Sequence, residues 1–259
     1  MKGFLLVLFL TTTSFAHAQG SGGGAPSPSM REQIEESDLL FARGKFTASR
    51  RIMDELIKTH PDDAEVLWRM AQHMINDGDG TRDREKRERL YRESVEYSEA
   101  AVKADPRSAD ARAYLAASYG SYAMFAGGKE KVKLANRIRD ELDQALRLDP
   151  DNQVALTIYG TWHREVSEVS WIERQLANMF LGSMPDGSIE ESIRYLNSAV
   201  RIAPKVFRHR YELALSYIAA DRLRDAAASF RAALQCPTSW KTDDRRRPRI
   251  REWLEENDL

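Results

Sequence analysis

The sequence predicts an all-α protein, a superhelix of about five helix pairs that carries one extra inserted helix. First, four prolines each follow an amphipathic helical stretch, and another stretch starts within a few residues of each. Second, a small or apolar residue recurs five positions before each of these prolines. Third, the chain shows no sustained alternation of polar and apolar residues, so strands are not expected. The prolines are Pro61, Pro106, Pro150 and Pro204, and Pro237 closes a last segment.

The N-terminal residues have the pattern of a secretory signal peptide. Lys2 precedes the apolar run 4–10, and a small-x-small motif ends at Ala18. We therefore expect residues 1–18 to be cut off after Ala18 and the protein to be secreted or periplasmic. The apolar run is too short to span a bilayer, which disfavours the alternative of an uncleaved anchor. Residues 19–29 are rich in Gly, Ser and Pro and predict a flexible tail.

Residues 30–240 form the predicted repeat domain, in which each unit is two helices joined by a turn. Proline cannot continue a helix and pushes the preceding residue toward extended conformations, so each second helix ends at a defined place. Turns between paired helices are visible at Gly44 and, in the last unit, at Asp221. This organisation resembles the tetratricopeptide repeat, a helix-turn-helix unit of about 34 residues that stacks into a right-handed superhelix. The recurring helix-packing positions are Leu56, Ala101, Ala145, Ala199 and Ala233.

Uneven proline spacing indicates that the middle units carry insertions. The spacings are 45, 44, 54 and 33 residues, and only the first and last units fit the ordinary repeat length. The insertions at 76–86 and 120–131 are rich in Gly, Asp, Lys and Arg and predict solvated loops or helix extensions. The third, at 166–187, contains a predicted extra amphipathic helix over residues 170–181.

Several segments resemble the regulator of microtubule dynamics family, whose members carry tetratricopeptide-like repeats. The resemblance covers about residues 60–240. Its most specific part is the inserted tryptophan-containing helix, because ordinary tetratricopeptide repeats lack it. The matching segments are EVLWRMA at 65–71, GTW at 160–162, WIER at 171–174 with Ala177, the turn from Pro185 to Ser188, and the helix at 189–203.

The resemblance implies two kinds of role. Animal members are linked to microtubules and to contact sites of mitochondria and the endoplasmic reticulum, and one member's repeat domain is associated with phospholipid binding and transfer. Because the chain carries a bacterial-type secretory signal, we expect a bacterial secreted relative and carry over no microtubule role. We expect a non-catalytic scaffold that binds a protein or peptide partner through its concave face. The alternative is a carrier or sensor of a lipid or other hydrophobic small molecule held inside the superhelix.

The first helix of each unit lines the concave face of such a superhelix, which gives a register for binding residues. Counting seven residues forward from each proline, and then one helical turn further, gives eight positions. A ninth residue, in the fourth unit, extends the stripe. Alternatively, the aromatic residues at its ends simply pack between units, as aromatic residues at helical spacing usually do. The predicted concave-face residues are Trp68, Gln72, Ala113, Ala117, Thr157, Thr161, Arg164, Tyr211 and Leu215.

A second apolar concentration surrounds the inserted helix and gives an alternative site, a hydrophobic ligand pocket. Its aromatic rings would wall a lipid or another hydrophobic molecule. The competing interpretation is that the inserted helix covers an apolar flank of the solenoid. The arginine of this set would pair with an acidic group inside the fold or with a ligand headgroup. The residues are Trp162, Trp171, Arg174 and Phe180.

Residues 241–259 predict a C-terminal capping helix with a cluster of five arginines. Asp243 and Asp244 precede the cluster, and four acidic residues follow it. The default interpretation is a solvated helix with internal charge pairs. The alternative is contact with anionic lipid headgroups. The arginines are Arg245, Arg246, Arg247, Arg249 and Arg251.

The sequence gives little support for catalysis. The four histidines after the signal peptide lack metal-ligand spacing, and the Gly-Gly-Lys at 127–129 lacks the rest of a phosphate-binding loop. We therefore predict no catalytic residue, no cofactor and no metal site. A formal net charge of −1 gives no electrostatic case for nucleic acid, or for more than peripheral membrane contact. Cys236 is the only cysteine, which excludes an intrachain disulfide, and we expect it to be a packing residue.

Overall fold

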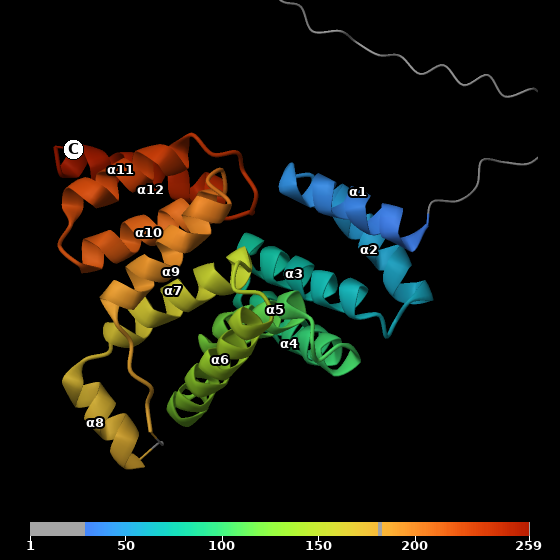
Figure 1. Ribbon diagram of the computed structural model, residues 1–259, viewed down its shortest axis with the longest axis horizontal. Helices are drawn as coiled ribbons and strands as arrows, with labels where there is room; N and C mark the ends of the chain where they lie inside the picture. Colours follow the sequence, from blue (N-terminus) through green and yellow to red (C-terminus); the bar gives the residue numbers. More distant parts are fainter. Residues whose placement is uncertain (1–28, 181–182, 259) are drawn as a thin grey trace, which may run out of the picture.

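The computed structural model describes residues 29–180 and 183–258, and within these ranges every regular element is an α-helix (Figure 1). Residues 1–28, which hold the predicted signal peptide and most of the predicted tail, lie outside the described part. The all-α prediction is confirmed. The helices are α1 (Met30–Ala42), α2 (Phe46–Thr59), α3 (Ala64–Gly80), α4 (Arg84–Ala104), α5 (Ala109–Ala123), α6 (Gly128–Leu148), α7 (Gln153–Ser167), α8 (Trp171–Phe180), α9 (Ile189–Ile202), α10 (Phe207–Ala219), α11 (Leu223–Leu234) and α12 (Asp243–Glu256).

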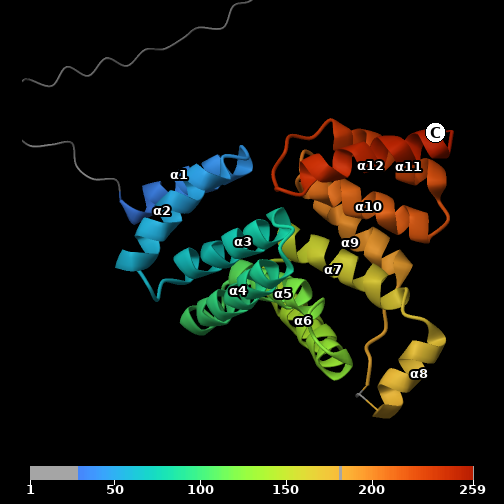
Figure 2. The same ribbon diagram turned by 180° about the vertical axis from the view of Figure 1, so that it is seen from behind.

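Neighbouring helices pair and stack into a superhelix. In the described part of the chain the pairs are α1 with α2, α3 with α4, α5 with α6, α7 with α9, and α10 with α11. The first helices α3, α5, α7 and α10 contact one another in succession and form the inner layer. The predicted inserted helix is α8, and both views show it projecting from the stack beyond the end of α7 (Figures 1 and 2).

Each of the four repeat prolines ends a helix, as predicted. The residue before each proline is the helix C-cap, and its N–H donates to the carbonyl oxygen four residues earlier at 2.8–2.9 Å. Two residues after the proline, a short polar side chain accepts hydrogen bonds from the first turn of the next helix in three units. These N-caps are Asp63, Ser108 and Asn152, whereas Val206 of the fourth unit makes no such bond.

The predicted helix-packing positions are buried, which explains their small size. Leu56 is 2% exposed, and the four alanines at the equivalent places are all fully buried. Gly160 of α7 shows how close the helices approach, because a side chain there would collide with Leu196 and with the backbone of Ser192 on α9. A small residue is therefore required where α7 crosses α9.

A buried polar pair repeats at the contact between units. One member lies twelve residues before a proline, on the second helix of a unit, and the other lies twelve residues after it, on the next first helix. Such pairs favour a single register, because a shifted register would leave a buried polar group without its partner. At the contact around Pro150 the same positions hold Ile138 and Trp162, both in the central apolar cluster. The side chains of Ser49 and His73 meet at 3.1 Å and those of Ser192 and Ser216 at 2.7 Å, whereas Ser118 Oγ donates to the backbone carbonyl oxygen of Ser94 at 3.2 Å.

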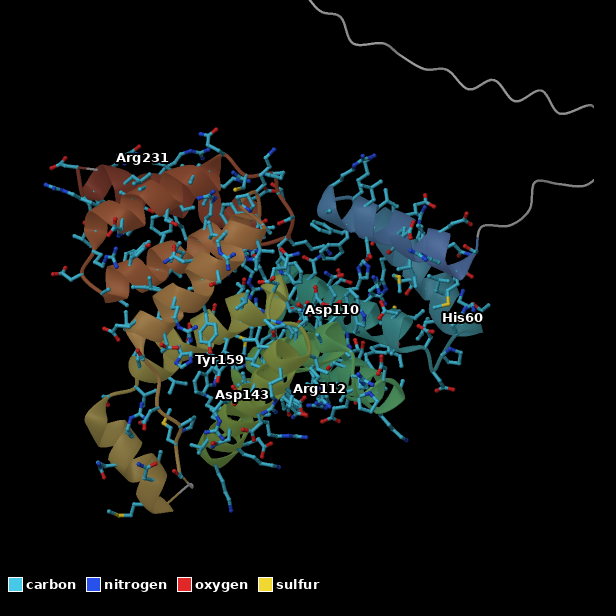
Figure 3. All side chains as sticks on the ribbon, viewed as in Figure 1. His60, Asp110, Arg112, Asp143, Tyr159 and Arg231 are labelled. Atoms are coloured by element: carbon cyan, nitrogen blue, oxygen red, sulfur yellow. The ribbon has the colours of Figure 1, made fainter. Side chains whose placement is uncertain are left out.

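Tyrosine hydroxyl groups also tie neighbouring units together. Tyr119 on α5 donates to Glu99 on α4 at 2.7 Å. Tyr159 on α7 donates to Asp143 on α6 at the same distance, and these two side chains are labelled in Figure 3. Burial, together with the neighbouring carboxylates, raises the pKa of both tyrosines above its ordinary value. Both hydroxyls therefore stay protonated donors at neutral pH.

The insertion at 76–86 is a helix extension, but it is not simply solvated. α3 continues to Gly80, Asn76 is completely buried, and the ring of Tyr91 leaves no room for a side chain at Gly78. Residues far away in the sequence cover this end of α3, whereas residues 82–86, which lead into α4, are exposed as expected. The insertion at 120–131 spans the end of α5 and the start of α6.

Candidate binding site

Two adjoining cavities lie along the inner layer, between α3, α5, α7 and the start of α10. Their volumes are about 240 Å³ and 460 Å³, and they are called here the smaller and the larger cavity. They share the wall residues Ala117, Ser121, Ile158 and Arg208, so one space adjoins the other. Ligand pockets in proteins commonly measure about 300–1,000 Å³, so the two together suit a small ligand or a few side chains.

The walls of the smaller cavity are mainly apolar, and their polar groups hold one another. Gln72 Nε2 donates to the Tyr114 hydroxyl at 2.5 Å. Thr157 Oγ1 lies 2.7 Å from His209 Nδ1, and the other ring nitrogen of His209 lies 3.1 Å from Gln153 Oε1. These groups can orient a ligand. The apolar wall residues include Phe41, Ile75, Val154, Ile158, Val206 and Trp240.

Residues 237–242, called here the closing segment, run from α11 back toward the N-terminal units and form one wall of the smaller cavity (Figure 1). Trp240 Nε1 donates to Asp79 Oδ2 at 2.7 Å, and its ring packs edge-on against Phe41 with centroids 5.4 Å apart. The Lys241 N–H donates to Asn76 Oδ1 at 2.9 Å. The segment therefore joins the two ends of the repeat array and narrows access to the concave face.

Arg208 places a positive charge beside both cavities. Within the described part of the chain no carboxylate oxygen lies within 4.0 Å of its guanidinium, and its buried Nε has no hydrogen-bond partner. The guanidinium carbon lies 5.7 Å from the centre of the Trp240 ring. An acidic group on a ligand would supply the missing partner.

Four of the nine predicted concave-face residues line the cavities. Gln72 and Thr157 line the smaller cavity, Thr161 lines the larger one, and Ala117 lines both. The structure brings these four together across three units.

The other five predicted residues are packing residues. Trp68 stacks on Tyr114 with ring centroids 5.0 Å apart, and Ala113 is completely buried in the core. Arg164 forms a buried ion pair with Glu212 at 3.0 Å. The remaining two, Tyr211 and Leu215, pack in the apolar cluster of α10, α11 and α12.

Of the four residues predicted around the inserted helix, the structure describes the side chains of Trp162 and Arg174, which have different surroundings. Trp162 lies in the wall of the larger cavity, and its Nε1 donates to the Ala135 carbonyl at 3.0 Å. Arg174 instead holds α8 to its flanking loops, donating to the carbonyl oxygens of Pro185 and Val166 at 2.7 and 2.9 Å. It also pairs with Asp186 at 3.2 Å. The side chains of Trp171 and Phe180 lie outside the described residues.

The cavity walls follow a helical stripe that the proline count only partly captured. Counted from the preceding proline, nine of the wall residues fall at positions 4, 8, 11 and 15, whereas the prediction used positions 7 and 11; at position 7 only Thr157 lies in a wall. The i, i+4, i+7, i+11 spacing is itself a sequence signal. Phe41 and Trp240, which also line the smaller cavity, do not follow this spacing. The stripe residues are Val154 and Arg208 at position 4, Tyr114 and Ile158 at position 8, Gln72, Ala117 and Thr161 at position 11, and Ser121 and Glu165 at position 15.

No group of three or more residues with metal-ligating side chains occurs in the described ranges. None of the helices in those ranges is both long and apolar enough to cross a membrane.

Two buried histidines predict a pH dependence of stability. Burial lowers the pKa of His73 to about 4 and that of His209 to about 3, below the ordinary 6.5. Below pH 6.5 the unfolded chain therefore binds more protons than the folded chain. The stability that the two neutral histidines contribute is complete above pH 6.5. It is lost as the pH falls toward 4 for His73 and toward 3 for His209. Each histidine should contribute a slope of up to about 1.4 kcal/mol per pH unit.

Urea unfolding between pH 4 and 7 measures this slope. His209→Gln should flatten the dependence, and His60→Gln, at the end of α2, is the matched histidine control (Figure 3). Equal slopes for the wild type and His209→Gln would contradict the assignment.

Comparisons with known proteins identify the family. A family model described as Regulator of microtubule dynamics protein 1-3 matches residues 33–258. The bovine regulator of microtubule dynamics protein 1 is 26% identical over 180 residues, which cover 69% of this chain and 56% of the bovine protein. The Caenorhabditis elegans protein of the same name is 25% identical over 215 residues, covering 82% and 93%. The chain thus spans little more than half the length of the first mammalian relatives it matches.

A solved structure supports the fold. The crystal structure of a thermophilic TPR protein from Thermus thermophilus superposes with a TM-score of 0.59 and 18% identity, covering 86% of this chain and 98% of that one. The tetratricopeptide-like architecture predicted from the prolines is thereby confirmed. With the family model matching from α1 to the end of α12, the protein belongs to the regulator of microtubule dynamics family.

Proposed function

We propose that the protein is a non-catalytic binding module that takes up a segment of a protein partner at its concave face. Tetratricopeptide-like superhelices act mainly as scaffolds, through the surface that their stacked units present. The observation that carries the proposal is the pair of adjoining, mainly apolar cavities on the inner layer, with the unpaired Arg208 beside them. A partner segment that offers apolar side chains and one acidic group would complement this site.

A second candidate function is the carriage of a hydrophobic small molecule or lipid. The observation that favours it is the closing segment, because Trp240 is tied to Asp79 on α3 and covers one side of the smaller cavity. A cavity partly closed in this way encloses a small ligand better than it admits a folded surface.

We further propose that binding takes place in the secretory or periplasmic compartment. The support is the signal-peptide pattern of residues 2–18. Intact mass measurement of the purified protein tests it, because cleavage after Ala18 leaves Gln19 as the first residue. A chain that retains Met1 would contradict this part of the proposal.

The substitution Ala117→Phe tests the proposed site, because Ala117 lines both cavities and is only partly buried. A phenyl ring there should fill the space where the cavities meet and should reduce capture of the partner at least tenfold. Pull-down from an extract of the source compartment, quantified by mass spectrometry, measures this. Ala228→Phe, on the exposed face of α11, is the matched control and should capture as the wild type does.

Native mass spectrometry of the same three proteins separates the two candidates. A co-purified hydrophobic molecule that is lost in Ala117→Phe, with no partner lost, would favour the carrier. Partners that bind Ala117→Phe and the wild type equally would refute the cavity as the binding site. Thermal unfolding must first show that both variants fold.

A further inference from the structure

The arginine cluster at the C-terminus does not behave as one solvated group. Arg247 is a structural residue, because its guanidinium donates to the carbonyl oxygens of Leu234 and Cys236 at 2.9 and 2.7 Å. Arg251 is exposed and lines none of the described pockets. The other three, Arg245, Arg246 and Arg249, converge on one pocket of about 440 Å³.

This pocket, called here the arginine pocket, lies between the first turns of α4 and the N-terminal half of α12. Arg87 of α4 adds a fourth guanidinium, and Thr242 adds a hydroxyl group. In the described part of the chain no ion pair is formed by Arg87, Arg245 or Arg249, and Arg246 makes only a long one, 3.7 Å to Glu212. Arg87 and Arg245 each donate one hydrogen bond to a backbone carbonyl oxygen, that of Thr81 at 2.6 Å and that of Asp79, which leaves their other N–H groups for a ligand. Three donor atoms in this wall are buried without a hydrogen-bond partner: Arg87 Nε, Arg246 Nη1 and Thr242 Oγ1.

The acidic groups near the pocket are already engaged. Asp79 accepts hydrogen bonds from the Tyr91 hydroxyl at 2.5 Å and from the indole of Trp240 at 2.7 Å. Asp243 accepts from the backbone N–H groups of Ser239 and Trp240 at 2.9 and 3.0 Å. Glu212 is paired with Arg164. The hydrogen-bonding oxygens of these three carboxylates are therefore largely occupied, and four guanidinium groups face three carboxylates.

We propose that the arginine pocket binds a phosphate group. Guanidinium groups bind phosphate oxygens through paired, charge-assisted hydrogen bonds, and several converging arginines suit a dianion better than a single carboxylate. Asp79 is the one carboxylate in the wall of this pocket, and four arginines with a single long ion pair among them, together with unpaired buried donors, are otherwise costly to hold so close together. A bound phosphate offsets that cost and gives the buried donors an acceptor.

The surroundings indicate where the rest of such a ligand would lie. The arginine pocket shares Asp79, Tyr91 and Met124 with the larger cavity, whose other walls are mainly apolar. A phosphate in the arginine pocket could therefore belong to a small soluble ester, or to a lipid whose apolar part enters the larger cavity. Both sources present the same group to the arginines.

Calorimetric titration with inorganic phosphate and glycerol 3-phosphate at low ionic strength tests the soluble source. Flotation with vesicles of phosphatidylcholine, with and without phosphatidic acid, tests the lipid source. The variant Arg87→Gln/Arg249→Gln should weaken binding at least tenfold. The matched control Arg82→Gln/Arg251→Gln removes the same charge from exposed positions outside the pocket and should bind as the wild type does.

Binding of a soluble phosphate ester that only the pocket variant loses supports the proposal with a free ligand. Binding of phosphatidic acid vesicles alone, lost only in the pocket variant, supports it with a lipid ligand. The proposal is overturned if neither source binds the wild type, or if the control variant loses binding as much as the pocket variant. Circular dichroism and thermal unfolding confirm that both variants are folded before titration.

Discussion

Arg164→Met should lower the free energy of unfolding by about 3–5 kcal/mol. Arg164 and Glu212 are both more than nine-tenths buried, and their side chains meet at 3.0 Å between α7 and α10. Methionine fills a similar volume but leaves Glu212 buried, with only Arg246 at 3.7 Å as a cationic partner. Urea unfolding at pH 7 measures the change.

The double variant Arg164→Met/Glu212→Leu is the matched control for this prediction. Removing both charges leaves no unpaired carboxylate, so stability should return to within about 1–2 kcal/mol of the wild type. A double variant as unstable as the single one would show that the arginine acts through its volume and its other contacts instead. Arg164 also has Glu165 at 3.1 Å, so Glu212→Gln alone should cost less.

Phe207→Ala should also destabilise the protein by about 3–5 kcal/mol. Phe207 is completely buried at the start of α10, in a cluster that joins α10, α11 and α12 through Ala233 and Ile250. Removing the ring creates a cavity where the last unit and the C-terminal helix meet. Thermal and urea unfolding measure the loss.

Leu223→Ala is the control for Phe207→Ala. Leu223 begins α11 with 37% of its surface exposed, so its truncation should cost less than about 1 kcal/mol. Similar losses for the two variants would contradict the placement of the core in this unit.

The helices and their ends could be predicted from the sequence because the responsible interactions are local. Each repeat proline and the polar N-cap two residues later lie within a few residues of the helix end that they determine. The polar pairs between units could have been found too. Ser49 and His73 lie symmetrically about Pro61, and Ser192 and Ser216 lie symmetrically about Pro204.

The binding cavities could be predicted only in part. The proline register identified Gln72, Ala117 and Thr161 at its second row, but its first row lay one residue away from the main stripe and reached the wall only at Thr157. Because successive residues lie about 100° apart around a helix axis, a shift of one residue selects a side chain that packs in the core instead, as at Ala113. The closing segment could not be predicted, because its contact between Trp240 and Asp79 joins residues 161 positions apart. No local pattern specifies such a contact.

Chemical modification of a single introduced cysteine tests most directly whether the partner binds at the two concave cavities. Cys236 is buried, so a Cys236→Ala chain provides a background for a single cysteine at Ser121, which lines both cavities, or at Ala228 on the exposed face of α11. Each protein is used to capture partners from extract before and after reaction with N-benzylmaleimide. If the concave cavities are the binding site, modification at position 121 should abolish capture and modification at position 228 should not. Undiminished capture after complete modification at position 121 would contradict the account.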